Sequence, residues 1–374
     1  MNKKIYTIHI WLGLLNGVWL LLLGISGSLL VYYHEIDRYL NKNLLQVQPI
    51  GQHISIDSLA TIVKQRVPNA RGTNILHFPN SVTDSYQFRV YIQDGSKDLI
   101  HWWETYNIDI NPYNGHILRE GYYRDINSSF MNWLFNLHWS LHLGPIGELV
   151  ILIAGLLLFI NIITGIIIYK KYILKAFVFK APFNWNNWRT VSSGIHRYVG
   201  VWSLLFNILI FFSGVQMNWP AFEKKTWTAP FVMKQIDQQY YPIDSLRQQV
   251  SKIYPGFTTH YLYIPFVKRR FGKDKDEVIT FRGNIPGTPS IIPESSSKVD
   301  FNPFTGNLIK KENVNEEISR MNLWEKFNAI VYSFHVGTFA GQFSRVLYIL
   351  IGLTPALLSI SGFMLWWRRK KIYN

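Results

Sequence analysis

Four apolar stretches constrain this chain more than any other feature of its 374 residues. They cover residues 5–33, 149–169, 199–219 and 346–367, and none contains Asp, Glu, Lys or Arg. A helix needs about 20 apolar residues to cross a hydrocarbon layer ~30 Å thick. The sequence therefore predicts four transmembrane helices. The first stretch is longer than a signal-peptide core of ~7–15 residues and no Ala-x-Ala site follows it, so we expect an uncleaved helix.

The positive charges are distributed unevenly along the chain. Twelve of the 38 basic residues flank the apolar stretches: Lys3 and Lys4, six within 170–197, and four at 368–371. By the positive-inside rule, both termini and the middle connection are then cytoplasmic. The net charge of +15 accordingly indicates orientation in membrane lipid and not nucleic-acid binding.

These positions give the expected fold class, an α-helical membrane protein with several spans. We expect a four-helix transmembrane bundle made of two internal repeats, with two small α+β periplasmic domains. Residues 86–92 alternate as a strand would, and turn signals divide both large segments. The expected order is helix 1 (1–33), domain 1 (34–133), interfacial segment and helix 2 (134–170), cytoplasmic loop (171–197), helix 3 (198–219), domain 2 (220–330), interfacial segment and helix 4 (331–367), and tail (368–374).

Three gap-free matches support the internal repeat. The first helices of the halves align at an offset of 187 and match Ser26-Gly27 with Ser213-Gly214. The second helices align at an offset of 197, where Thr164-Gly165 resembles Ser361-Gly362. The outer segments share a turn, Asp109-x-Asn-Pro-x-x-Gly115 and Asp300-x-Asn-Pro-x-x-Gly306, at an offset of 191.

Four of the eleven histidines take part in this repeat. His9 matches His196 at the cytoplasmic ends of the outward-running helices, and His138 matches His335 before the inward-running ones. Ionisable groups at the edge of a membrane are costly and usually functional. Paired neutral imidazoles in a bundle interior are a standard way to hold haem iron. We therefore expect two haem b groups, one near each face. The chain has no cysteine, which excludes covalent haem attachment and Fe–S clusters.

Other positions refine the prediction and leave alternatives open. Gly13 and Gly200 lie one turn after His9 and His196 on the same helix face, where a side chain would collide with a porphyrin edge. His142 also lies on the face of His138, but its repeat partner is Phe339, which favours His138 as the ligand. His34 is a weaker candidate. A simpler alternative is that these histidines lie at the interface and make only polar contacts between helices. A zinc site is less favoured than haem, because no carboxylate repeats alongside the histidines.

The chain resembles the PepSY-associated transmembrane family over nearly its whole length. The resemblance rests on His9-x-x-x-Gly13, Leu137-His138-Trp-Ser-Leu141, His196-Arg-Tyr-Val-Gly200, His335-Val-Gly337 and the closing run from Ser361 to Arg369. It implies PepSY-like outer domains, and it makes His138 and not His142 the family's recurrent histidine. Family members include di-haem reductases of ferric siderophores in the bacterial inner membrane, so it implies that location and a role in iron acquisition.

The expected function is electron transfer across the membrane through two haems, with Fe(III) of a ferric siderophore reduced to Fe(II) on the periplasmic side. The electron donor would be a separate cytoplasmic molecule or a quinol. Two other functions stay open: a membrane-anchored binding or inhibitory protein, and a siderophore transporter. His101-Trp102-Trp103 and Trp219 would belong to an interfacial aromatic belt or a domain core, or would form a docking surface for the acceptor.

Overall fold

The computed structural model describes residues 3–92, 104–223, 239–264 and 278–373. The chain divides into two compact units. The helix unit comprises residues 1–33, 137–222 and 331–374, and the sheet unit comprises residues 34–136 and 223–330. Each unit thus draws on both halves of the sequence, and each is described by itself.

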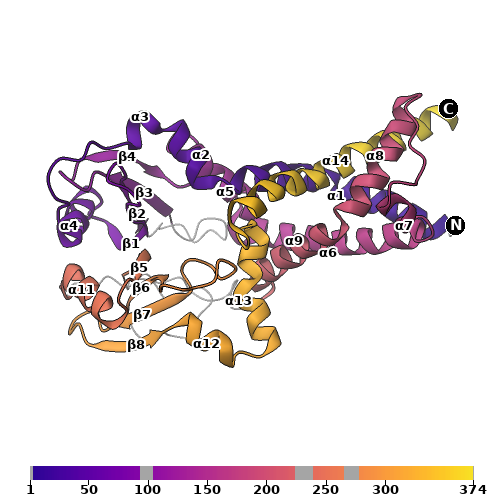
Figure 1. Cartoon of the computed structure of the whole chain (residues 1–374). Coiled ribbons are helices and arrows are strands. Elements are labelled where there is room, and N and C mark those ends of the chain that lie inside the picture. Colours follow the sequence, from indigo (N-terminus) through magenta and orange to yellow (C-terminus); the bar gives the residue numbers. More distant parts are fainter. Residues whose placement is uncertain (1–2, 93–103, 224–238, 265–277, 374) are drawn as a thin grey trace. The chain divides into compact units, whose positions relative to one another are not determined.

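Four helices of the described chain are long and apolar enough to cross a membrane. They are α1 (Lys3–Leu30), α6 (Gly144–Tyr169), α9 (Leu204–Asn218) with its 3₁₀ extension η1 (Trp219–Phe222), and α14 (Gly341–Tyr373). They run alongside one another, and the start of α1, the end of α14 and α7 (Ile173–Phe177) lie at the same end of this unit (Figure 1). The chain is therefore a membrane protein, as predicted.

Helix α1 shows why these helices suit lipid. Its exposed face carries Trp11, Leu15 and Val18, which are 62–67% exposed, whereas its buried face carries Asn16 and small residues such as Gly24. Apolar residues outside and small or polar residues inside are typical of helices that pack closely in a bilayer. The interface with α14 is close, because a Cβ added at Gly24 would lie 2.8 Å from the Gly352 carbonyl oxygen.

The third span begins at Leu204, later than the predicted residue 198. Helix α8 (Trp188–Trp202) ends before Ser203, and α9 begins at Leu204. The Ser203 hydroxyl donates to the Val199 carbonyl at 2.6 Å, a local bond that competes with helix continuation and often bends a helix. Two helices that precede spans, α5 (Phe130–Ser140) and α13 (Leu323–Val336), carry His138 and His335 near their ends.

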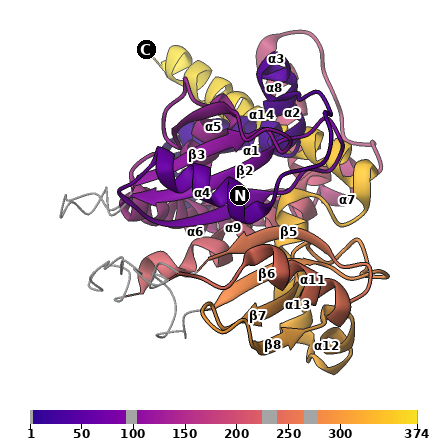
Figure 2. The same ribbon diagram turned by 90° about the vertical axis from the view of Figure 1, so that its left-hand side faces the viewer.

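The sheet unit contains one antiparallel sheet of eight strands, in the order β4-β3-β2-β1-β5-β6-β7-β8. Its strands are β1 (Ala70–His77), β2 (Tyr86–Ile92), β3 (Glu104–Ile110), β4 (Ile117–Tyr122), β5 (Thr258–Tyr263), β6 (Ile279–Asn284), β7 (Ser297–Phe301) and β8 (Leu308–Glu312). The two halves meet where Ile75 of β1 pairs with Leu262 of β5, and β5 to β8 continue the sheet of the first half (Figure 2). The two separate outer domains of the sequence prediction therefore share one continuous sheet.

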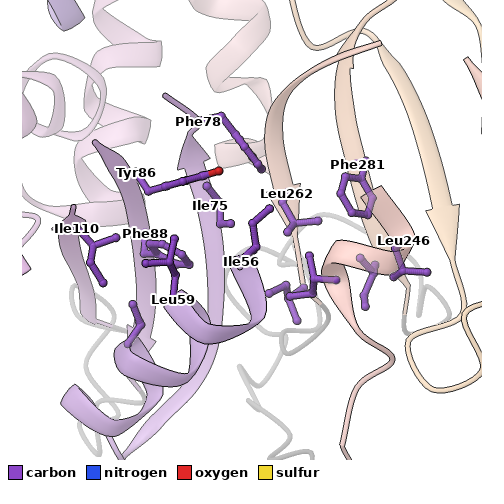
Figure 3. Packing of buried hydrophobic residues seen from close by; sticks show 14 of the residues in the cluster. Ile56, Leu59, Ile75, Phe78, Tyr86, Phe88, Ile110, Leu246, Leu262 and Phe281 are labelled. Atoms are coloured by element: carbon purple, nitrogen blue, oxygen red, sulfur yellow. The ribbon is translucent and has the colours of Figure 1, made fainter. Parts of the chain in front are cut away.

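A single hydrophobic cluster spans both halves of this sheet (Figure 3). Strands β2, β6 and β7 bury alternate residues, as strands with one covered face do. Helices α4 (Ile56–Arg66) and α11 (Ile243–Ile253) contribute residues at helical spacing, among them Leu59 and Leu246, both fully buried. Other helices of this unit are α2 (Tyr33–Leu40), α3 (Lys42–Leu45) and α12 (Val314–Arg320).

Candidate functional site

The four repeated histidines meet in two pairs inside the helix unit. His9 of α1 faces His196 of α8 with ring centroids 6.3 Å apart, and His138 of α5 faces His335 of α13 at 6.4 Å. The ring planes are nearly perpendicular in the first pair (87°) and inclined by 52° in the second. We name these the inner pair and the outer pair, after the predicted topology. Each pair takes one histidine from each half of the chain.

Every histidine of the two pairs has its Nδ1 within hydrogen-bond distance of a hydroxyl on a neighbouring helix. The distances are 3.1 Å for His9 and Thr164, 3.0 Å for His196 and Ser361, 2.8 Å for His138 and Ser26, and 2.9 Å for His335 and Ser213. In each case the histidine and the hydroxyl belong to the same half of the chain. Each half of the chain thus supplies the hydroxyl groups that bond to its own histidines. The histidines of one half then lie opposite those of the other half.

The hydroxyl hydrogens settle which imidazole nitrogen is protonated. Ser26, Ser361, Ser213 and Thr164 each donate to a backbone carbonyl of their own helix at 2.7–2.8 Å. Because that hydrogen is already used, the hydroxyl oxygen must accept from the imidazole, which makes Nδ1 the protonated nitrogen. His9 and His335 also place Nδ1 near the Asn161 and Ile210 carbonyl oxygens, which can only accept. Nε2 then keeps a free lone pair on all four rings.

A glycine follows each of these hydroxyl residues and makes room for the histidine ring. A Cβ added at Gly27, Gly165, Gly214 or Gly362 would lie 3.0–3.4 Å from Cε1 of the histidine held there. Such contacts are tighter than ordinary packing allows, so even alanine would push the ring. The four imidazoles therefore pack on the repeated Ser/Thr-Gly pairs, which we call the Ser/Thr-Gly seats. The sequence predicted these pairs as part of the repeat, but not their contact with the histidines.

Gly13 and Gly200 have a different environment. A Cβ added at Gly13 would meet Asn161 at 3.5 Å, and one added at Gly200 would meet Leu358 at 3.6 Å, both ordinary van der Waals distances. Packing within the protein does not require glycine at either position. A group lying between the histidines of the inner pair would give a reason for both glycines.

The spacing of each pair fits one metal atom held between two imidazoles. A ring with ~1.33 Å bonds places each nitrogen about 1.1 Å from the centroid, and imidazole binds metals at ~2.0–2.1 Å, so two opposed imidazoles have centroids about 6.3 Å apart. No cluster of three metal-binding side chains occurs among the described residues. Two imidazoles at this spacing suit an iron whose four other positions are filled by a porphyrin. The donor set therefore fits haem better than zinc.

The remaining histidine candidates lie elsewhere. His142 has a left-handed backbone (φ 58°) in the turn between α5 and α6, and the residue facing His335 is His138. His34 faces His77 in the sheet unit at 5.8 Å between centroids. Burial and the neighbouring His77 lower the pKa of His34 to about 4, which keeps it neutral. His101-Trp102-Trp103 lie outside the described residues, and Trp219 is half exposed at the end of α9.

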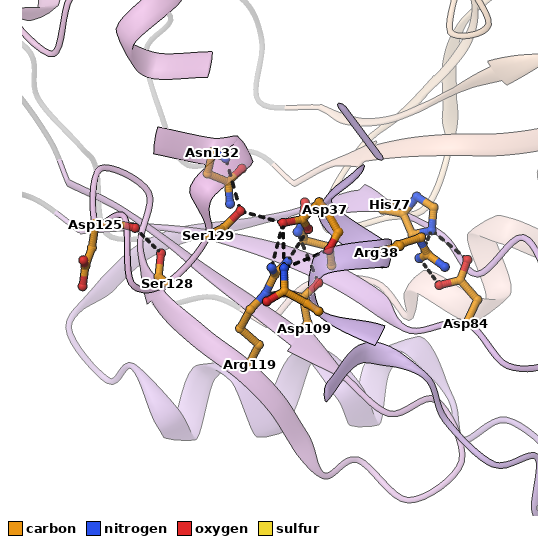
Figure 4. A network of polar contacts seen from close by, with 12 residues as sticks. Asp37, Arg38, His77, Asp84, Asp109, Arg119, Asp125, Ser128, Ser129 and Asn132 are labelled. Atoms are coloured by element: carbon orange, nitrogen blue, oxygen red, sulfur yellow. Dashed lines mark hydrogen bonds and ion pairs between the residues drawn. The ribbon is translucent and has the colours of Figure 1, made fainter. Parts of the chain in front are cut away.

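His77 belongs to a polar cluster that the sequence did not reveal (Figure 4). Its Nε2 lies 3.0 Å from Asp84, which also pairs with Arg38. Burial alone would raise the pKa of Asp84, but the bonds from His77 and Arg38 outweigh it and lower the pKa to about 2. The adjoining cavity of about 20 Å³, lined by His34, Arg38 and His77 among others, has room for about one water. It is too small for a metal chelate.

A buried ion network lies beside this cluster (Figure 4). Arg119 binds both carboxylate oxygens of Asp37 at 2.8 and 3.0 Å and donates to Asp109 at 2.8 Å. Ser129 donates to Asp37 at 2.8 Å. These bonds tie α2, which follows the first membrane span, to strands β3 and β4. The network is a structural anchor, because each charge has a partner of opposite sign.

The two halves of the sheet unit are also joined by a reciprocal contact between helix starts. Asp57 of α4 accepts from the backbone N–H groups of Ile243 and Asp244 at 2.8 and 3.1 Å, and Asp244 of α11 accepts from the Asp57 N–H at 3.0 Å. Both carboxylates thereby cap the other helix. The sequence does contain a signal for this contact, because Ile56-Asp-Ser-Leu59 recurs as Ile243-Asp-Ser-Leu246 at the offset of 187. This repeat was not among the predicted matches.

Comparison with known proteins gives a family match. The family model described as the PepSY-associated TM region matches residues 6–369 of the chain. No curated protein matches it. The matched range covers both units and all four histidines of the two pairs.

Proposed function

The chain belongs to the PepSY-associated transmembrane family, and from this premise we propose that it carries electrons across the bacterial inner membrane through two b-type haems. The acceptor is a ferric siderophore on the periplasmic side, whose Fe(III) is reduced to Fe(II). A separate cytoplasmic donor or a membrane quinol supplies the electrons. The product serves iron acquisition, because Fe(II) is held less tightly than Fe(III) by hard oxygen ligands.

One observation carries this proposal. Four imidazoles, each with Nδ1 engaged by a hydroxyl and Nε2 left with a lone pair, face each other in two pairs at 6.3 and 6.4 Å. A hydrogen bond from the distal ring nitrogen fixes the tautomer and orientation of a metal-binding histidine and raises its basicity. Histidines that served only helix contacts would not need this arrangement four times.

The two pairs also suit the distance to be crossed. From His9 to Gly27, which contacts the outer His138, α1 rises by about 27 Å, close to the ~30 Å of the hydrocarbon layer. Haem bound at both pairs would supply one-electron carriers near each face. The chain's own residues hold the imidazoles and set the separation of the two levels.

The architecture supports further parts of the proposal. We attribute the two pairs, the Ser/Thr-Gly seats and the mirrored strand order to an internal duplication, with PepSY-like segments in both halves of the sheet unit. The basic residues near the start of α1, around α7 and near the end of α14 favour an orientation with both termini in the cytoplasm. The inner pair then lies near the cytoplasm and the outer pair near the periplasm.

Reduction across a sealed membrane tests the function directly. Proteoliposomes of the haem-loaded protein would contain dithionite, with a ferric hydroxamate siderophore and a chromogenic Fe(II) chelator outside. We expect external Fe(II) to form faster than in protein-free vesicles, and we expect H335A, which removes one outer ligand, to return the rate to that baseline. Equal rates for the wild-type protein and protein-free vesicles would contradict the proposal.

The same vesicles separate the other functions. A siderophore transporter would accumulate labelled siderophore without any reductant. A binding or inhibitory protein would show neither uptake nor reduction and would be purified without haem from haem-sufficient cells.

A further inference from the structure

The segment that joins α6 to α8 exposes large apolar side chains and basic side chains together. Its most exposed apolar residues are Leu174 and Trp185, both 77% exposed, and Phe179, which is 69% exposed. Large apolar side chains gathered on a surface mark a contact with a partner or with lipid. We call residues 170–189 the basic aromatic segment. Its basic residues are all exposed and are Lys170, Lys171, Lys175, Lys180 and Arg189.

The positive charge of this segment has no counter-ion in the neighbouring sequence. No Asp or Glu occurs from residue 149 to residue 222. In the part of the chain that the structure describes, none of the five basic residues forms an ion pair. A surface that carries charge of one sign attracts ligands of the opposite sign. The segment therefore suits an anionic partner from outside the chain.

The basic aromatic segment is fixed on α8. The ring of Phe179 stacks on Trp202 with 5.1 Å between centroids, and the Tyr198 hydroxyl donates to the Ala181 carbonyl at 2.5 Å. The exposed side chains therefore belong to a defined surface. Because Tyr198 lies two residues after His196, this contact also stabilises the helix that carries one histidine of the inner pair.

The exposed side chains of the segment are poorly suited to water. The backbone of Phe179 has a left-handed conformation (φ 56°), which is rare for a bulky residue, and yet its side chain is exposed. Strain that leaves an aromatic ring in water would be doubly unfavourable. Trp188 is 65% exposed, within the range of Trp11 and Val18 on the apolar face of α1 (62–67%). The segment thus resembles the faces of the spans that suit lipid.

The segment lies at one end of the helix unit. The start of α1 and the end of α14 lie at this same end, and α8 is steeply inclined to α6 (Figure 1). A helix inclined in this way at the end of a bundle can lie along a membrane surface. Aromatic side chains on such a helix enter the boundary between lipid headgroups and acyl chains.

We propose that the basic aromatic segment lies in the headgroup layer of the membrane and binds anionic phospholipids. Its Lys and Arg side chains pair with the lipid phosphates, and Leu174, Phe179 and Trp185 enter the boundary beside the acyl chains. An acidic soluble protein would match the charge alone and would leave these apolar side chains in water whenever it dissociated. The proposal depends on the membrane spans and not on haem, so its failure would leave the proposed function intact.

The depth of the segment in the bilayer is the first test. The chain has no cysteine, so L174C can carry a single nitroxide label in the full chain in lipid nanodiscs. We expect collisions with molecular oxygen, which concentrates in lipid, to exceed collisions with a water-soluble Ni(II) chelate. V82C, at a 62% exposed residue of the sheet unit, is the matched control and should show the reverse. Equal access of the chelate to both labels would overturn the proposal in favour of a soluble partner.

The selectivity for lipid charge is the second test. Spin-labelled phosphatidylglycerol and phosphatidylcholine, compared in the same membranes, report the fraction of each lipid that is held at the protein. We expect at least about a twofold preference for phosphatidylglycerol, as attraction of basic residues to anionic headgroups implies. K175Q/K180Q/R189Q should lower this preference, whereas K42Q/K64Q/K252Q, which removes three exposed charges from the sheet unit, should not. No preference in the wild-type protein, or an equal preference in the two variants, would overturn the proposal.

Discussion

The helix unit and the sheet unit treat the two halves of the chain differently. In the helix unit each element of the histidine sites occurs in both halves: a histidine, a hydroxyl that engages its Nδ1, and a glycine beneath its ring. In the sheet unit the strands are equivalent but their polar residues are not. Arg119 is buried between two carboxylates, whereas Lys310 at the equivalent position of β8 is exposed and pairs with Glu312.

The paired histidine sites require matching residues in both halves, whereas the sheet does not. A site made from two opposed imidazoles cannot tolerate divergence in either half, because one ligand alone leaves a position open. A sheet pairs through its backbone, so its surface residues are free to differ. Five measurements test this contrast.

Loss of one ligand should abolish one site and spare the other. H196A removes one of two opposed ligands from the inner pair, so we expect half of the haem to be lost and the outer haem to stay. Pyridine haemochrome assay against protein concentration gives the stoichiometry. Loss of both haems together, in protein that elutes as a single peak, would show that the pairs are not independent.

Loss of the buried arginine should destabilise the first half of the sheet unit far more than loss of its equivalent destabilises the second. R119M leaves Asp37 and Asp109 buried without a counter-ion, which costs about 3–5 kcal/mol. K310M removes an exposed charge and should leave the midpoint of thermal unfolding unchanged. Scanning calorimetry of both variants checks this, and similar midpoints would remove the asymmetry between the halves.

Loss of one hydroxyl should weaken one haem site. S26A leaves the Nδ1–H of His138 without its acceptor, and such changes typically cost 10–100-fold in metal affinity. S28A is the matched control on the same helix, since the Ser28 hydroxyl donates to the Gly24 and Ile349 carbonyls and not to a histidine. Haem transfer to apomyoglobin measures both, and equal rates would leave the hydroxyl without a role in binding.

The contact between Asp57 and Asp244 should make the sheet unit sensitive to pH. Burial first, and the Asp244 carboxyl after it, raise the pKa of Asp57, although backbone N–H groups oppose this. The folded protein then binds the proton more tightly than the unfolded chain. Protonated Asp57 therefore contributes its full stabilisation at pH values below the ordinary carboxyl pKa. That stabilisation is lost as the pH rises through the raised pKa of Asp57. D57N should flatten this slope, an effect of about 0.2–1 kcal/mol as for partly exposed pairs. An unchanged slope in calorimetry from pH 3 to 7 would refute it.

Replacement of the nearby histidine should have the smallest effect. H142A leaves all four paired imidazoles in place, so we expect two haems per chain and unchanged spectra. A lost or shifted outer haem signal would make His142 the ligand in place of His138.

The sequence was sufficient to predict the membrane spans and the four paired histidines. Both predictions have a physical basis. Span length is set by bilayer thickness, and the repeat sorted His9, His196, His138 and His335 from the other seven. The sequence was not sufficient to predict that β1 pairs with β5, because no residue pattern in either strand indicates which other strand it pairs with. The burial of Arg119 was also hidden, since its partner Asp37 is 82 residues away.

The most direct test of two haem sites in one bundle is the absorbance of the purified protein, reduced by dithionite, minus that of its oxidised form, with haem counted per chain. Two opposed imidazoles on each iron predict sharp, low-spin b-type bands and two haems per chain. Protein purified from haem-sufficient cells that shows no such bands, or that binds haem only at a ratio far below two, would contradict the account.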